Sequence, residues 1–192
     1  MFKIIVLISG NGSNLQAIID ACKSGMIGGN VVGVISNKAN VFGLERAKKN
    51  NIPSEVINHN NFGTREEFDQ ELVTSIRSYQ PDLIVLAGFM RILSPIMTSA
   101  FKNKMINIHP SLLPKYPGLK THEQVIANND AEHGVTIHLV SEELDGGPII
   151  AQSKIVVHKN QQLEDLIERI HKIEHKIFPK VISMIALSLI HI

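Results

Sequence analysis

Short apolar segments alternate with helix-like segments through the first half of this chain, and this alternation most constrains its fold. The apolar segments, which are rich in Ile, Val and Leu as buried strands are, cover residues 3–8, 31–36, 82–87 and 105–108. Helical patterns cover residues 14–23, 43–50 and 65–79. Strands buried on both faces and joined through helices form mostly parallel sheets with helices on both sides. We therefore predict an α/β fold with a Rossmann-like, open, mostly parallel sheet.

The second half of the chain adds a different pattern. Residues 134–140 and 149–157 are predicted to form a strand pair, joined through the turn Asp145-Gly146-Gly147-Pro148, as an antiparallel addition to the sheet. A long helix is predicted over residues 162–177, and Pro179 is expected to kink or restart it. The residues expected on its buried face are Ile167, Ile170, Ile173 and Ile177.

Length, charge and cysteine content narrow the class of protein. A chain of 192 residues suits one domain with a substantial core, so we predict a single domain over residues 1–192. The net charge of +1 gives no electrostatic reason to expect binding to nucleic acid or to an anionic membrane. The apolar tail 181–192 is shorter than the roughly 20 residues that cross a bilayer, so we expect a cytoplasmic protein. Cys22 is the only cysteine, which excludes an internal disulfide.

A glycine-containing turn follows the first apolar segment and opens the first helical one. Free backbone amides at the start of a helix attract phosphate, and glycine lets the chain turn sharply there. The dinucleotide-binding pattern fails because Leu15 occupies the position of its third glycine. Two interpretations remain open: a site for one phosphate at Gly12, Ser13 and Asn14, or a tight turn in which Ser13 and Gln16 form a capping box.

A second turn follows the apolar segment 82–87. Gly88 permits close approach of a ligand or of another backbone segment. The side chains of Met90, Ile92 and Leu93 would line an apolar slot, and Arg91 would meet a carboxylate. A cluster of Met, Ile and Leu is also the composition of an ordinary core, so both interpretations stay open.

Three polar residues suggest a catalytic site. Asn107 and His109 are two apart at the end of an apolar segment, so they face the same side of a strand, and Pro110 ends regular pairing there. Asp145 lies in the later Gly-Gly-Pro turn. An amide, an imidazole and a carboxylate can together polarise a carbonyl, hold an oxyanion and move a proton without a metal. The alternatives are a structural histidine beside proline and an aspartate that only forms a turn.

These four segments occupy equivalent positions, because each follows a predicted strand. Open α/β sheets bind ligands outside the carboxyl edge of their strands, so we expect all four segments on one such edge. The chain contains neither a metal-ligand spacing such as H-E-x-x-H nor the serine nucleophile pattern G-x-S-x-G. We therefore expect an active cleft that uses no metal.

The motifs resemble those of the phosphoribosylglycinamide formyltransferases, a family of folate-dependent formyltransferases in purine biosynthesis. The resemblance extends from Lys3 to about Ile182. The motifs that carry it are Ile8-Ser9-Gly10-Asn11-Gly12-Ser13-Asn14-Leu15-Gln16, Leu86-Ala87-Gly88-Phe89-Met90-Arg91, Asn107-Ile108-His109-Pro110-Ser111-Leu112-Leu113-Pro114 and Leu144-Asp145-Gly146-Gly147-Pro148. It implies transfer of a formyl group from 10-formyltetrahydrofolate to the amine of glycinamide ribonucleotide, giving formylglycinamide ribonucleotide and tetrahydrofolate.

The resemblance also implies roles for individual residues. The catalytic set would be Asn107, His109 and Asp145. Glycinamide ribonucleotide would contact Gly12, Ser13, Asn14, His171, Lys172, Ile173 and Glu174. The folate would contact Arg65, Met90, Arg91, Ile92, Leu93, Asn107, Ser141, Glu142, Glu143, Leu144 and Asp145. From the residues alone, Glu174 is equally well explained as a solvated charge on a helix that also carries His171, Lys172 and His175.

Three other functions compete with this one. A formyltransferase that acts on initiator methionyl-tRNA would carry a further nucleic-acid-binding domain and more positive charge. A hydrolase that releases formate would carry an extra amino-terminal domain. A non-catalytic protein that binds a phosphometabolite would use only the turn at Gly12–Asn14, and it would leave Asn107, His109 and Asp145 without a role. We therefore expect two small-molecule substrates, with no nucleic-acid or membrane partner, and a homodimer remains open.

Overall fold

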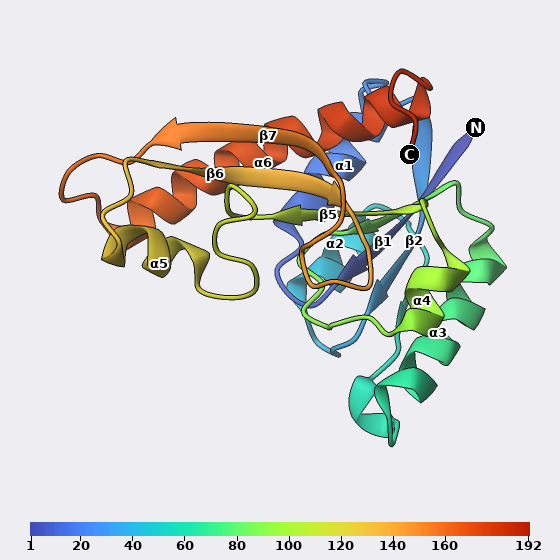
Figure 1. The fold of residues 1–192 in the computed structure, drawn as a ribbon. Helices are drawn as coiled ribbons and strands as arrows, with labels where there is room; N and C mark the ends of the chain where they lie inside the picture. The colour runs from blue at the N-terminus through green and yellow to red at the C-terminus, as the bar shows by residue number, and fades with distance from the viewer.

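The computed structural model describes residues 1–192 and contains one seven-stranded sheet (Figure 1). Its strands are β1 (Phe2–Ile8), β2 (Gly29–Ser36), β3 (Ser54–Val56), β4 (Leu83–Leu86), β5 (Met105–His109), β6 (Glu132–Leu139) and β7 (Ile149–Val156). They lie in the order β3-β2-β1-β4-β5-β6-β7. The first five strands are parallel, and β6 and β7 are antiparallel additions. The predicted fold class is therefore confirmed.

Six helices surround the sheet. They are α1 (Ser13–Lys23), α2 (Phe42–Lys49), α3 (Arg65–Tyr79), α4 (Pro95–Ala100), α5 (Thr121–Ala127) and α6 (Leu163–Ala186), with a 3-10 turn, η1 (His59–Asn61). α3 begins with a capping box in which Thr64 accepts from the backbone of Glu67. The elements that we did not predict are β3, η1, α4 and α5, which are seven residues or shorter and therefore too short for a periodic pattern.

The two faces of the sheet carry separate apolar cores. One core packs β1, β2 and β5 against α1 and α6, and the other packs the opposite faces of β1, β4 and β5 against α3 and α4. In β5, Ile106 and Ile108 face the α1 and α6 side. Because side chains alternate along a strand, Asn107 and His109 face the other side.

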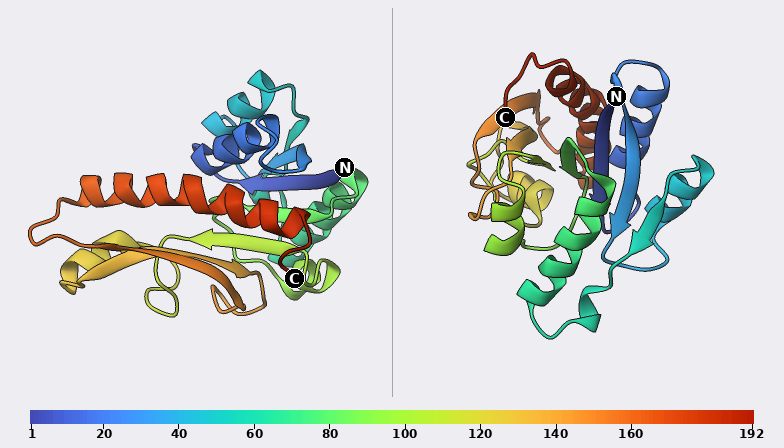
Figure 2. Two further views of the ribbon diagram at one scale, coloured as in Figure 1. Left: turned by 90° about the horizontal axis from the view of Figure 1, so that it is seen from above. Right: turned by 90° about the vertical axis from the view of Figure 1, so that its right-hand side faces the viewer.

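Helix α6 differs from the predicted one in length and in the face that it buries. It continues through Pro179 to Ala186, although proline removes one backbone hydrogen bond, because Val181, Ile182 and Ile185 are buried beyond it. Figure 2 shows α6 running alongside β6 and β7. The expected restart at Pro179 is therefore wrong. None of the helices combines the length and apolarity that a membrane span requires.

The buried face of α6 is displaced by one residue from the predicted face. Its fully buried residues at four-residue spacing are Leu166, Ile170, Glu174 and Phe178. Of the predicted set only Ile170 is fully buried, whereas Ile173 and Ile177 are partly buried beside the core. Glu174 consequently lies inside the protein, so its interpretation as a solvated helix charge is wrong.

The start of α1 also differs from the predicted capping box. The residue that caps α1 is Gly12, in a left-handed conformation with φ of 72°, and no side chain caps the helix. Gln16 instead hydrogen-bonds to Asp20 and Arg46. The capping-box interpretation is therefore wrong, and the Ser13 hydroxyl is not used as a cap. A Cβ atom on Gly12 would lie 2.8 Å from Cα of Gly43 at the start of α2, so the two helices meet closely here.

Gly12→Ala tests this close approach. An alanine in the left-handed region costs roughly 1–2 kcal/mol, and its methyl group would also push against the backbone of α2. We expect the free energy of unfolding, measured with urea, to fall by at least about 1 kcal/mol. Gly10→Ala is the matched control, because a Cβ atom there meets no atom within 4 Å. Equal losses in the two variants would contradict the prediction.

A pair of imidazoles, one of them buried, joins α5 to β6. Nδ1 of His122 lies 2.9 Å from Nε2 of His133, and His133 is almost completely buried. Burial first, and then the neighbouring His122, lower the pKa of His133 from near 6.5 to about 4. The folded protein therefore holds His133 neutral at a pH where the unfolded chain would protonate it.

This lowered pKa predicts acid sensitivity. The unfolded state binds the extra proton between pH 6.5 and about 4, so the stabilisation present above pH 6.5 is lost as the pH falls through this range. The loss from this residue is at most on the order of 3 kcal/mol. Urea unfolding at several pH values should show a shallower decline in His133→Leu than in the wild type. Identical slopes would contradict the assignment to His133.

Candidate active site

Three of the four predicted site segments meet at one edge of the sheet. The parallel neighbours β1, β4 and β5 end side by side, so the turn at Gly12, the turn at Gly88 and the pair Asn107 and His109 share the carboxyl edge. The fourth segment arrives differently. Because β6 is antiparallel, its last residue pairs with Ile106 near the amino end of β5. The prediction that Asp145 follows a strand at the shared edge is therefore wrong, and the loop after β6 carries Asp145 back to His109.

His109 is held by both of its ring nitrogens. Nε2 lies 2.8 Å from the carbonyl oxygen of Tyr116, and because a carbonyl only accepts, Nε2 carries a proton. Nδ1 lies 3.4 Å from Oδ2 of Asp145. His109 is 5% exposed, so few water molecules compete for these contacts. The arrangement is most favourable when Nδ1 is protonated as well, because a carboxylate then faces a cation.

The same loop that contacts His109 also holds Asp145. Oδ2 of Asp145 accepts a hydrogen bond of 2.8 Å from the backbone of Gly118. The loop is anchored at its start, where Ser111 donates to the carbonyl of Lys115 and the hydroxyl of Tyr116 donates to Asp130. A single backbone segment therefore sets the distance between the imidazole and the carboxylate.

Asn107, the third catalytic residue, contacts His138, which was not selected from the sequence. The pairing of β5 with β6 places Asn107 directly opposite His138, and Nδ2 of Asn107 lies 3.1 Å from Nε2 of His138. That ring nitrogen also lies 3.7 Å from Oδ1 of Asp145. Only the strand register could have identified His138, because 31 residues separate it from Asn107.

A small slot with a mixed polar and apolar lining adjoins this group. The predicted folate residues that line it are Arg91, Ile92, Leu93, Asn107, Ser141, Glu142, Glu143, Leu144 and Asp145. Leu86, Phe89, His138 and Val140 line it as well, and sequence reasoning did not select them. The slot has a volume of about 90 Å³. Arg65 and Met90 are not among its lining residues; both are exposed, and Arg65 lies 3.8 Å from Glu66.

The turn beside this slot is braced by a second residue that was not predicted. The hydroxyl of Ser9, at the end of β1, accepts a hydrogen bond of 2.7 Å from the backbone of Met90. The same hydroxyl donates to Oδ1 of Asn37 at 2.6 Å. Ser9 is buried, so this network fixes the turn after β4 to the ends of β1 and β2.

One hydrogen bond joins the predicted phosphate-binding turn, Gly12–Asn14, to α6. Nδ2 of Asn14 donates to Oε2 of Glu174 at 3.0 Å, and Glu174 is 5% exposed. Burial raises the pKa of Glu174, against the lowering effects of Asn14 and of the nearby charge of His171. The buried Oδ1 of Asn14 has no hydrogen-bond partner within the protein. Asn14 and Glu174, which are remote in sequence, therefore form a polar pair with unused hydrogen-bonding capacity.

The other predicted residues of α6 are spread around the helix. His171 is exposed and stacks on His175 with 6.3 Å between ring centroids. Lys172 forms an exposed ion pair with Glu168, and Ile173 packs beside the core. The pKa of His122 is lowered by burial and then by the charge of His171.

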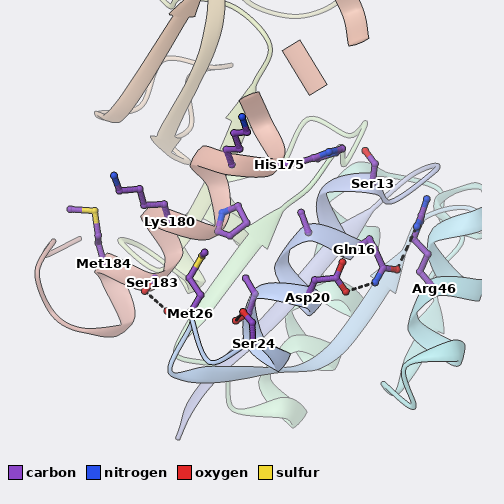
Figure 3. Close-up of a pocket in the computed structure, with 14 residues that line it drawn as sticks. Ser13, Gln16, Asp20, Ser24, Met26, Arg46, His175, Lys180, Ser183 and Met184 are labelled. Atoms are coloured by element: carbon purple, nitrogen blue, oxygen red, sulfur yellow. Dashed lines mark hydrogen bonds between the residues drawn. The ribbon is translucent and has the colours of Figure 1, made fainter. Parts of the chain in front are cut away.

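A wide groove of about 1050 Å³ runs between α1 and α6. Figure 3 shows Ser13 and His175 at one end of this groove and Ser183 and Met184 toward the other. Asn107, His109 and Asp145 do not line it. Of the predicted phosphate-binding turn, Ser13 lines this groove.

Comparison with known proteins agrees with this geometry. A family model described as formyl transferase matches residues 2–182. Phosphoribosylglycinamide formyltransferase of Escherichia coli is 54% identical over 184 residues, which cover 96% of this chain and 87% of that protein. The human trifunctional purine biosynthetic protein adenosine-3 is 42% identical over 96% of this chain, although the match covers only 18% of the human protein.

Solved structures show the same likeness in three dimensions. Phosphoribosylglycinamide formyltransferase from Coxiella burnetii, solved with CHES, superimposes with a TM-score of 0.96 at 46% identity, covering 100% of this chain and 90% of that one. Glycinamide ribonucleotide transformylase 1 from Symbiobacterium toebii superimposes with a TM-score of 0.95 at 41% identity, covering 98% and 89%. With a family model that spans nearly the whole chain and with relatives this similar, the chain belongs to the formyl transferase family.

Proposed function

We propose that this chain transfers the formyl group of 10-formyltetrahydrofolate to the amine of glycinamide ribonucleotide, in purine biosynthesis. The observation that carries the proposal is the meeting of His109, Asp145 and Asn107 beside a slot of mixed polar and apolar lining, in a chain whose relatives bear the name of this activity. The proposal treats residues 1–192 as one formyltransferase domain that acts in the cytoplasm on two small molecules. It requires no metal.

The amide of Asn107 and the imidazole of His109 stabilise the charge that develops during transfer. Attack of the free amine on the formyl carbon moves negative charge onto the formyl oxygen. Nδ2 of Asn107 has a second N–H besides the one directed at His138, and that N–H donates to this oxygen. A protonated His109 adds a positive charge in a buried site, where screening by water is weak.

Asp145 balances the charge of the His109 imidazole and also transfers a proton. Its Oδ2 balances the charge of His109, and the Gly118 amide keeps that oxygen in place. The attacking amine must lose a proton, and the departing folate nitrogen must gain one. The carboxylate of Asp145 accepts the first proton and returns it to the folate nitrogen, so the formamide product and tetrahydrofolate form without net proton change.

The turn at Gly12–Asn14 and the carboxyl group of Glu174 orient the nucleotide. The backbone amides of Gly12, Ser13 and Asn14 hold the phosphate at the start of α1. Glu174 binds the polar groups of the ribose and glycinamide, with His171, Lys172 and Ile173 around it. Holding the nucleotide at two points turns a bimolecular encounter into a positioned reaction.

The slot beside the catalytic group accepts the folate. Ile92, Leu93 and Leu144 contact the flat heterocycle. The remaining folate contacts are Arg65, Met90, Arg91, Asn107, Ser141, Glu142, Glu143 and Asp145. The exposed Arg65 and the half-buried Arg91 match the negative charge at the far end of a folate.

The direct test mixes the purified protein with 10-formyltetrahydrofolate and glycinamide ribonucleotide and follows the folate absorbance together with the formylated product. Loss of formyl-folate that needs the nucleotide supports the proposal. Formate release without nucleotide would instead show a hydrolase. No reaction with both substrates, despite measurable nucleotide binding, would show a binding protein.

Asn107→Ala and Asp145→Ala should each lose turnover. Removal of one oxyanion donor typically lowers kcat about 10²- to 10³-fold, and Asp145→Ala also removes the proton acceptor. Substrate dissociation constants, measured by calorimetry, should change much less. Asp165→Ala, which removes an exposed carboxylate from the first turn of α6, is the control. Near-normal turnover of either active-site variant at neutral pH would refute the assigned roles.

Glu174→Gln should weaken nucleotide binding in a pH-dependent way. A hydrogen bond to a charged group contributes about 1.5–3 kcal/mol, so KM for the nucleotide should rise roughly 10- to 100-fold at neutral pH. The pKa of Glu174 is raised, so wild-type KM should also rise as the pH falls and the carboxyl becomes neutral. The variant should lack this rise. Glu164→Gln, at an exposed position, is the control. If KM of Glu174→Gln rose at low pH as much as KM of the wild type, the assigned role of Glu174 in nucleotide binding would be contradicted.

A further inference from the structure

His138 contacts two of the three catalytic residues and has no role in the reaction as described so far. It lies on β6 directly opposite Asn107, and its side chain is 3% exposed. Nε2 of His138 lies 3.1 Å from Nδ2 of Asn107 and 3.7 Å from Oδ1 of Asp145. The two oxygens of Asp145 therefore face two imidazoles, because Oδ2 lies 3.4 Å from Nδ1 of His109.

The hydrogen bonds around His138 determine where its proton lies. Nδ1 is 2.8 Å from the carbonyl oxygen of Leu139. A carbonyl oxygen has no proton to give, so Nδ1 must donate and must carry the hydrogen. In a neutral ring Nε2 is then a lone pair, and the group that faces it has to be a donor. The Asn107 amide satisfies this requirement only when its nitrogen, and not its oxygen, points at His138.

We propose that His138 is a positioning residue that selects which end of the Asn107 amide lies beside the reacting carbon. The inference rests on the proposed function, since it assigns the Asn107 nitrogen to the formyl oxygen. With Nε2 as an acceptor, the amide nitrogen gives one hydrogen to His138 and keeps its second for the oxyanion. With a hydrogen on Nε2, the amide would turn over and place its oxygen where the donor had been.

Burial of the ring favours the neutral form of His138. Burial is the main cause that lowers the pKa of His138, and the charge of His109 on β5 lowers it further. The Leu139 carbonyl and Asp145, in the loop after β6, act in the opposite direction. Protonation of His109 thus opposes protonation of His138, because both imidazoles share one carboxylate. The neutral ring keeps Nε2 of His138 as an acceptor for the Asn107 amide.

The position of the proton can be measured without any substrate. Long-range proton–nitrogen NMR of the wild-type protein labelled with nitrogen-15 distinguishes the two neutral tautomers and the imidazolium. The His138 signals are assigned by their disappearance in His138→Gln. At pH 7 we expect the Nδ1–H tautomer, with Nε2 as an acceptor. An Nε2–H tautomer or a charged ring at this pH would overturn the proposal, whether or not the protein transfers formyl groups.

Kinetics then test the consequence. His138→Leu removes the acceptor, and we expect kcat to fall about 10- to 100-fold while KM for either substrate changes by no more than about threefold. In His138→Gln, Oε1 can accept from Asn107 in place of Nε2, so most of the lost kcat should return. His133→Leu is the control, because His133 is an equally buried histidine on β6 that pairs with His122 and not with Asn107.

The outcomes distinguish the positioning role of His138 from the proposed formyl-transfer function. Normal kcat in His138→Leu, or an equal loss of kcat in His138→Gln and His138→Leu, would refute the positioning role. The same loss in His133→Leu would show that any buried histidine of β6 matters only for folding, and urea unfolding of all three variants checks this directly. Absence of formyl transfer by the wild type would refute the proposed function, and the tautomer would still be decided by NMR.

Discussion

The antiparallel pairing of β5 with β6 is the constraint on which the active site depends. Its register places Asn107 opposite His138 and His109 opposite Thr136. Because β6 reverses the direction of the sheet, the chain must return through a loop before it can enter β7, and that loop carries Asp145 to His109. A register shift of one residue would turn both Asn107 and His109 into the core beneath α1 and α6. The catalytic group is therefore a direct product of strand pairing.

The loop between β5 and α5 is the second support of the site. Its backbone contributes the carbonyl of Tyr116 to His109 and the amide of Gly118 to Asp145. Backbone groups can be placed more accurately than long side chains because they have fewer rotatable bonds. A hydrogen-bond network below the loop supports it: Thr136 donates to the carbonyl of Ser111 and accepts from the backbone of Leu113. Buried polar groups that are satisfied in this way give a single arrangement of the loop.

Helix α6 shows how a catalytic scaffold accommodates an unfavourable residue. A buried carboxylate without a cationic partner is costly, and burial accordingly raises the pKa of Glu174. Phe178 and Ile170 on the same face supply apolar burial that offsets this cost. Asn14 provides one donor, and its own buried oxygen remains unpaired. Unused hydrogen-bonding capacity of this kind is expected at a binding site, because a substrate can satisfy it.

Much of this molecule follows from sequence alone. Apolar runs such as that of β1 and the helical period of α3 specify their elements locally, because the burial period acts over a few residues. The spacing of Asn107 and His109 is also local, so a strand necessarily puts them on one face. Tertiary structure decided what local patterns do not encode. Helix α6 continues through Pro179 because the residues beyond it pack into the core. Glu174 lies inside the protein because the buried face of α6 is rotated toward α1. His138 meets Asn107 only through the register of β5 and β6. These contacts join residues that are remote in the chain, and their energies exist only once the sheet has formed.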